Sequence, residues 1–167
     1  MPRARDPANL VDALAAAAPL ATRWMERLLA ANDPPLTVAQ YLALAAVRRE
    51  LLTGAELARR AGVSGAAVSQ LVAGLERAGW VTRARQTDDR RRQALALTPL
   101  GERALDQATD LLRARLGRLL AGLPRPEADA LARLLGRLEE TLAGSPPPRR
   151  PPPRPPRAPE ARRHGRR

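Results

Sequence analysis

The residues of this sequence that are best suited to bind a polyanion are concentrated in one stretch, residues 53–101. Arg90, Arg91 and Arg92 directly follow Asp89 at the tip of an expected β-hairpin. Two short helices joined by a Gly turn come just before this hairpin. This order of elements predicts a winged helix-turn-helix, in which one helix enters a DNA groove and the hairpin extends over the DNA backbone.

The helix before the hairpin carries the other candidate contacts. Ser64 is expected to cap it and Gly79 to end it, because Ser is a favoured N-cap and Gly is favoured just after a helix. Its apolar residues recur at helical spacing and are expected to face inward: Val68, Leu71, Val72 and Leu75. The candidate DNA contacts on this helix are small or polar: Ser64, Gly65, Ala66, Ala67, Ser69 and Gln70.

Amphipathic segments flank this unit on both sides. We expect helices at residues 7–31, 99–122 and 126–143, each with an apolar stripe. The helix at 99–122 is too long to be packed along its whole length by a small winged domain. The simplest way to bury the stripes is helix packing between two chains, and an intramolecular bundle is the alternative.

The winged unit is expected to span residues 36–101, inside a single domain of residues 1–144. Thr37 with Gln40, and Thr53 with Glu56, have the spacing of capping boxes at the starts of two helices. The expected strands are residues 80–86 and 93–97, with a short strand at Leu51 and Leu52.

The charge and composition of the chain limit the kinds of function that it can have. The net charge is +12 and all 29 basic residues are Arg, a balance that indicates a polyanionic partner such as nucleic acid. Residues 145–167 hold eight Arg and nine Pro, so we expect a disordered tail, with loose phosphate contact as its functional alternative. The chain has no Cys, and its single His lies in this tail. We therefore expect no metal site, no cofactor and no enzymatic centre.

The N-terminal segment has a superficial likeness to a secretory signal, because an apolar run at 13–21 follows a basic start. Asp6 and Asp12 interrupt that pattern, and no apolar run reaches the roughly 18 residues that span a bilayer. We expect a cytoplasmic, nucleoid-associated protein without a membrane partner.

Four motifs, taken in order, resemble those of the MarR family of transcriptional regulators. They are LTVAQY at 36–41, similar to an LTxxQ helix start; ELA at 56–58 with GVS at 62–64; LE at 75–76 with GWV at 79–81; and DRR at 89–91 with LT at 97–98 and Gly101. The first three recur in many winged helices, whereas the fourth, similar to a DxR wing followed by LTxxG, is the discriminating one. The resemblance covers residues 7–143.

The resemblance implies a mainly α fold, a winged helix-turn-helix with flanking dimerisation helices. It also implies a homodimer that binds pseudo-palindromic double-stranded DNA, usually as a repressor. In the family, binding of a small aromatic ligand often releases the protein from DNA. Arg91 would enter the minor groove and Asp89 would orient it, since a narrow minor groove attracts a guanidinium. A solvated hairpin tip is the alternative.

The recognition helix departs from the family pattern. Ala66 and Ala67 stand where Pro-Thr is common, and Gln70 stands where Arg is frequent. Gln suits adenine, but with so few long side chains we expect much of the specificity to come from DNA shape.

The resemblance also implies an effector site between the DNA unit and the dimerisation helices. Trp24, Tyr41 and Arg48 are its candidates, because they combine aromatic stacking with a cation for an aromatic acid. Plain core packing is the alternative for Trp24 and Tyr41. The absence of Cys excludes the thiol-oxidation branch of the family.

Two other functions stay open at this point. One is a non-specific architectural DNA-binding protein that uses the wing and the tail. The other is a winged-helix protein-interaction module that has lost DNA binding, which the small side chains of the recognition helix make conceivable.

Overall fold

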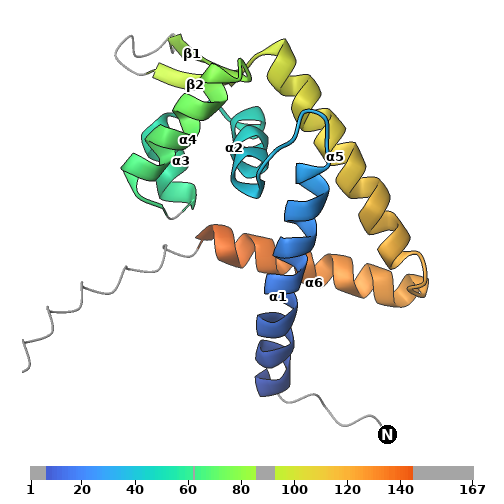
Figure 1. Ribbon diagram of the computed structural model, residues 1–167. Coiled ribbons are helices and arrows are strands. Elements are labelled where there is room, and N and C mark those ends of the chain that lie inside the picture. Colours follow the sequence, from blue (N-terminus) through green and yellow to red (C-terminus); the bar gives the residue numbers. More distant parts are fainter. Residues whose placement is uncertain (1–6, 62, 86–92, 145–167) are drawn as a thin grey trace, which may run out of the picture.

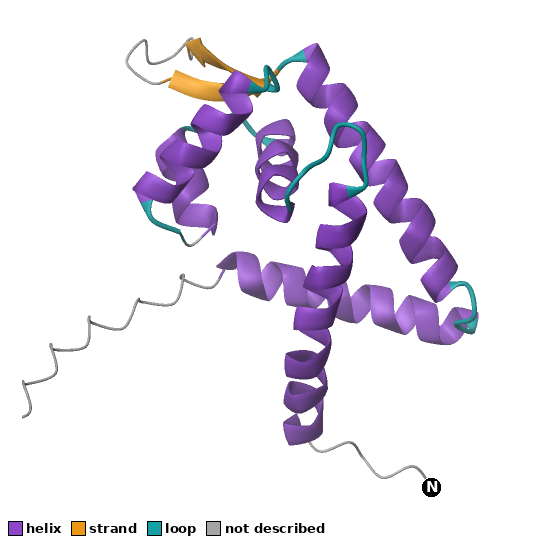
Figure 2. Cartoon of the chain, viewed as in Figure 1, coloured by secondary structure: helices purple, strands orange, loops and turns teal. Residues whose placement is uncertain are grey.

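The computed structural model describes residues 7–61, 63–85 and 93–144, which form a mainly helical molecule with one small sheet (Figures 1 and 2). The elements follow in this order: α1 (Pro7–Ala30), α2 (Val38–Arg49), α3 (Gly54–Ala61), α4 (Gly65–Arg77), β1 (Val81–Arg85), β2 (Gln93–Leu97), α5 (Pro99–Leu120) and α6 (Arg125–Gly144). This order confirms the predicted winged helix-turn-helix between flanking helices.

Side-chain caps determine where the first helices of the winged unit begin. The Thr37 hydroxyl accepts a hydrogen bond from the Gln40 amide at 3.1 Å, and the Gln40 side chain accepts one from the Thr37 amide at 2.8 Å. Thr53 and Glu56 make the same reciprocal pair at the start of α3. Both predicted capping boxes are therefore confirmed.

The end of α4 determines where the hairpin begins. Gly79 has φ +70, its amide donates to the Glu76 carbonyl, and the Trp80 amide donates to the Leu75 carbonyl at 2.9 Å. These two bonds close the helix with a glycine in the left-handed conformation. Because the Trp80 amide is used in this way, β1 begins at Val81, one residue later than predicted.

The two strands pair antiparallel, with Val81 opposite Leu97 and Arg85 opposite Gln93. The predicted short strand at Leu51 and Leu52 is reduced to a single bridge, in which the Leu95 amide donates to the Leu52 carbonyl at 2.8 Å. The expected end of the first strand, residue 86, lies outside the described residues.

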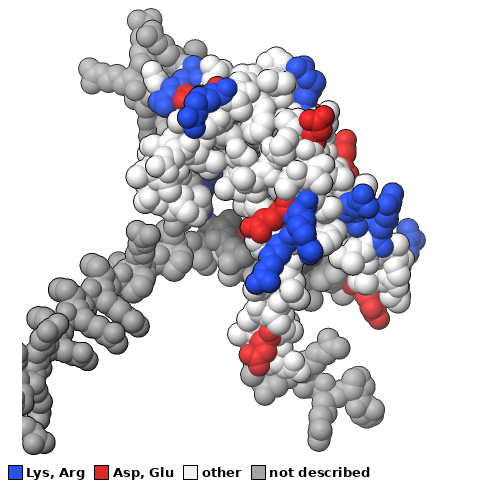
Figure 3. Space-filling model, viewed as in Figure 1, with Lys and Arg blue, Asp and Glu red and all other residues white. Residues whose placement is uncertain are grey.

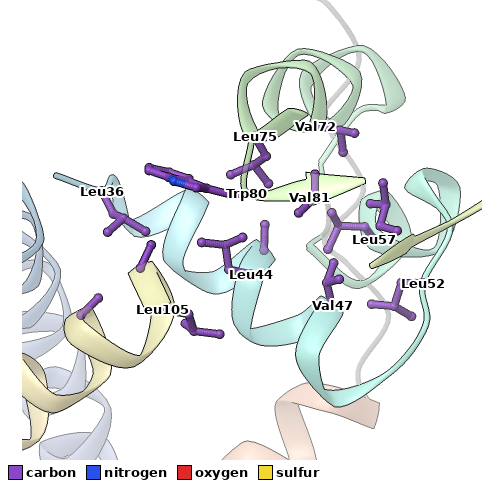
Figure 4. Packing of buried hydrophobic residues seen from close by; sticks show 14 of the residues in the cluster. Leu36, Leu44, Val47, Leu52, Leu57, Val72, Leu75, Trp80, Val81 and Leu105 are labelled. Carbon is purple, nitrogen blue, oxygen red and sulfur yellow. The ribbon is translucent and has the colours of Figure 1, made fainter. Parts of the chain in front are cut away.

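The core joins the first and fifth helices to the winged unit. Its largest fully buried side chains come from four helices: Leu29 of α1, Leu44 of α2, Leu75 of α4 and Leu105 of α5. Figure 4 shows Trp80, from the turn after α4, lying beside Leu75 in this cluster. Burying a leucine stabilises a fold by about 1.5–3 kcal/mol, so these contacts hold α4 in a fixed orientation.

The outer helices leave apolar side chains exposed. In α5 the buried residues end at Leu112, and Leu119 is 67% exposed. Leu10 of α1 is 70% exposed, Leu134 of α6 is 61% exposed, and none of the α6 side chains that the structure describes is buried. Among the described helices, none combines the length and the apolar character needed to cross a bilayer.

Candidate nucleic-acid interface

Helix α4 has one buried face and one exposed face. Val68, Val72 and Leu75 are buried and Leu71 packs against them, which confirms the predicted inward stripe. The opposite face consists of exposed residues with small or uncharged side chains: Gly65, Ala66, Ala67, Ser69, Gln70 and Ala73. The structure therefore places the predicted contacts of this helix on one accessible surface.

Ser64 holds the N-terminus of α4. Its backbone is extended, and its hydroxyl oxygen accepts a hydrogen bond from the Ala67 amide at 3.2 Å. This is the N-cap that the sequence predicted. The hydroxyl proton is still able to donate, so Ser64 can cap the helix and contact an acceptor outside it.

Charged side chains gather at the C-terminal end of α4 and on the adjoining strand. In Figure 3 the surface over the rest of α4 is uncharged, whereas basic and acidic atoms lie together at that end. Glu76 and Arg77 stand in the last turn of α4, and Arg83 of β1 pairs with Glu76. The exposed face of α4 is thus neutral along most of its length and charged at one end.

Sequence reasoning did not single out the ion pair at this end. Arg83 donates through Nε to Oε1 of Glu76 at 2.7 Å, and its Nη1 lies 3.5 Å from Oε1 of Gln93 on β2. The pKa of Arg83 is raised above its ordinary value. The larger cause is the hydrogen bond with the Glu76 carboxylate, and the second is the negative charge of that carboxylate. The sequence contained one signal for this pair: two residues of opposite charge stand seven positions apart, on either side of the turn at Gly79.

A cavity of about 380 Å³ lies between α3, α4 and the hairpin. Its polar lining is Ser69, Arg83 and Gln93, and Gly54 and Gly65 form part of the remaining wall. Two predicted contacts, Gly65 and Ser69, therefore share a cavity with Arg83 and Gln93, which sequence reasoning missed.

The wing residues Asp89, Arg90, Arg91 and Arg92 lie outside the described residues. The structure follows the two strands of the hairpin between Val81 and Arg85 and between Gln93 and Leu97. The role of the wing arginines stays a prediction.

Solved structures of other proteins share this fold. RV1404 from Mycobacterium tuberculosis is 26% identical, with a TM-score of 0.70 over 83% of this chain and 95% of that one. A mutant of MarR from E. coli complexed with operator DNA is 25% identical, with a TM-score of 0.60 over 80% of this chain and 99% of that one. Residues 35–92 match the model of the MarR family. The chain is thus similar to MarR-family regulators in sequence over that segment and in fold.

A curated relative shows the same similarity. The HTH-type transcriptional repressor YetL of Bacillus subtilis (strain 168) is 32% identical over 92 residues, a match that covers 55% of this chain and 55% of YetL. The match therefore spans about half the length of this relative. Members of the MarR family are transcriptional regulators and not enzymes, which bears out the expectation for this chain.

The three candidate effector residues have different surroundings. Trp24 lines a mostly apolar cavity of about 950 Å³ between α1 and α5, whose wall includes neither Tyr41 nor Arg48. Tyr41 packs against the core, and Nη1 of Arg48 donates to Oδ1 of Asp106 at 2.6 Å. Trp24 is the candidate that lines this cavity.

Proposed function

We propose that this chain is a dimeric DNA-binding transcriptional regulator that represses by occupying pseudo-palindromic operators. The observation that carries this proposal is the exposed face of α4, which is neutral and built from small side chains. Such a face lets a helix approach the floor of a major groove closely, where Ser69 and Gln70 reach base edges. The similarity to MarR complexed with operator DNA supports the same function.

Dimerisation is supported by the exposed leucines of the outer helices. Leu10, Leu119 and Leu134 lie on α1, α5 and α6, all outside the winged unit. Apolar residues gathered on one part of a soluble protein mark a surface that another molecule covers. A two-fold interface between copies would present two α4 helices about one turn of DNA apart, roughly 34 Å.

The wing adds contacts beside the groove that α4 occupies. In this proposal Arg91 enters the minor groove and Asp89 orients it, while Arg90 and Arg92 neutralise phosphates. Binding to the chromosome would place the protein with the nucleoid in the cytoplasm.

A small aromatic ligand is the proposed effector. The α1–α5 cavity supplies the aromatic ring of Trp24 and the apolar side chains of Leu116 and Leu119, and the cations of Arg23 and Arg27 suit a carboxylate. Because Leu119 is largely exposed, a second chain packed on α5 would border this cavity. Ligand binding there would change the relative position of the two DNA units.

Selection of duplexes from a random pool tests the proposed function directly. A regulator of this kind enriches a two-fold-symmetric site and binds it far more tightly than random DNA at the same salt concentration. Equal affinity for all duplexes would identify an architectural protein. Absence of any binding would identify a protein-interaction module, and either result would overturn the proposal.

Replacing Gln70 by Ala is expected to weaken binding to the selected site by about 1–3 kcal/mol, because a bidentate Gln–adenine contact is lost. Affinity for each single-base variant of the site would be measured by fluorescence anisotropy. Discrimination should disappear at one base pair of each half-site. Gln107→Ala makes the same change at an exposed position on α5 and should leave the site preference unchanged. An unaltered preference in Gln70→Ala would remove this residue from base recognition.

A further inference from the structure

The side chain of Arg83 connects three elements at the base of the hairpin. Its Nε donates to the Glu76 carboxylate in the last turn of α4 at 2.7 Å, and its Nη1 reaches the Gln93 side chain on β2 at 3.5 Å. Arg83 itself belongs to β1. One guanidinium therefore joins both strands to the recognition helix.

One face of the hairpin is anchored in the core, and the Arg83 contacts are made on its exposed face. Its sheet contains only β1 and β2 in the part of the chain that the structure describes, with the single bridge from Leu52 to Leu95 beside β2. A two-stranded hairpin is marginally stable without packing against other elements. Val81, Ala94 and Leu95 are buried, whereas Arg83 and Gln93 are exposed.

We propose that Arg83 is a positioning residue, and that its ion pair with Glu76 fixes the angle between the β1–β2 hairpin and α4. This inference rests on the proposed function, because the angle matters for the simultaneous contact of helix and hairpin with DNA. Glu76 is 31% exposed and lines the open cavity formed with Gln70, Ala73 and Arg77 on the outer side of α4. A carboxylate at that place would repel phosphates if the guanidinium did not neutralise it.

Arg83 could act in two ways, by contacting phosphate directly or by positioning the hairpin through its pair with Glu76. The substitution Glu76→Gln changes DNA affinity in opposite directions in these two cases. If Arg83 only contacts phosphate, removing the nearby negative charge raises affinity. If the pair positions the hairpin, the same substitution lowers affinity although the protein gains positive charge. We expect a 3- to 10-fold loss of affinity for the selected site. Unchanged or tighter binding would overturn the proposal.

Exchanging the two charges separates positioning from direct phosphate contact. The double variant with Glu76→Arg and Arg83→Glu keeps the net charge and allows the ion pair to form in reverse. Arg83→Gln removes the guanidinium and should lower affinity for the selected site. We expect the double variant to recover most of that loss. A double variant as weak as Arg83→Gln would show that the guanidinium must itself sit on β1, and would overturn the proposal.

Hydrogen exchange in the full-length, DNA-free protein tests the positioning separately from DNA binding. Glu76→Gln should speed exchange of the amides of residues 81–85 and 93–97 and leave those of α2 unchanged. Glu50→Gln is the control, because Glu50 also pairs with an arginine, Arg60, at 2.5 Å and touches no strand residue through that bond, although its side chain is more exposed (55%) than that of Glu76 (31%). Unchanged hairpin exchange in Glu76→Gln would overturn the proposal whatever the DNA result. If the hairpin amides exchange faster in Glu76→Gln but the wild-type protein selects no duplex, the positioning role stands and the proposed function is refuted.

Discussion

Replacing Gly101 by Ala is expected to lower the free energy of unfolding by about 3 kcal/mol, a fall in Tm of about 6–12 °C for a chain of this size. A Cβ at this position would lie 2.0 Å from the Trp80 carbonyl oxygen and 2.8 Å from its carbon. Both atoms are backbone, so no side-chain rotation relieves the clash, and the start of α5 must move away from the turn after α4.

That movement would also disrupt the hydrogen bonds of the same joint. The Thr98 amide donates to the Trp80 carbonyl at 3.0 Å, and the Thr98 hydroxyl donates to the Gly79 carbonyl at 2.6 Å. The Gly101 amide donates back to the Thr98 hydroxyl at 3.1 Å. Gly101 therefore permits the close approach through which α5 is attached to the winged unit.

Thermal unfolding followed by circular dichroism measures this effect. Gly74→Ala is the control, because its Cβ would meet nothing within 4 Å in the interior of α4. There the substitution should raise stability by about 0.5–1 kcal/mol, since Ala favours the helix over Gly. A Gly101→Ala variant that melts at the wild-type temperature would show that α5 does not need this approach.

The elements of this fold could be predicted because their signals are local. Thr37, Thr53 and Ser64 each accept a hydrogen bond from an amide three residues ahead, so the residue types alone indicated where the helices begin. The buried stripe of α4 followed from helical spacing in the same way. The start of β1 was missed by one residue because the hydrogen bond from Trp80 to Leu75 depends on the geometry of the Gly79 turn.

The candidate site was only partly predictable because several of its contacts join distant positions. Arg48 was interpreted as a ligand cation, yet its partner Asp106 lies 58 positions further along the chain. Nothing local in the sequence indicates that ion pair. The connection between Arg83 and Glu76 required the orientation of the hairpin against α4, which depends on packing in the core.

Replacing Leu134 and Leu135 together by Glu is expected to dissociate the proposed dimer and to weaken binding to a two-half-site operator by roughly 100-fold or more, the factor that linked binding sites commonly supply. The two side chains are 61% and 54% exposed on α6. Burying two carboxylates in an apolar interface is strongly unfavourable. In a single chain the carboxylates face water and Glu is a good helix former, so the fold should survive.

Sedimentation equilibrium should show the mass of two chains for the wild type and of one chain for the double variant at micromolar concentration. Affinity for a duplex with a single half-site should stay the same, because α4 and the hairpin are untouched, and this separates lost dimerisation from a damaged DNA surface. Leu42→Glu is the control, since Leu42 is 56% exposed on α2, outside the three outer helices, and its variant should remain dimeric. If the α6 variant keeps the mass of two chains and its full operator affinity, then α6 does not hold the copies together, and the exposed leucines of α1 and α5 must do so without it.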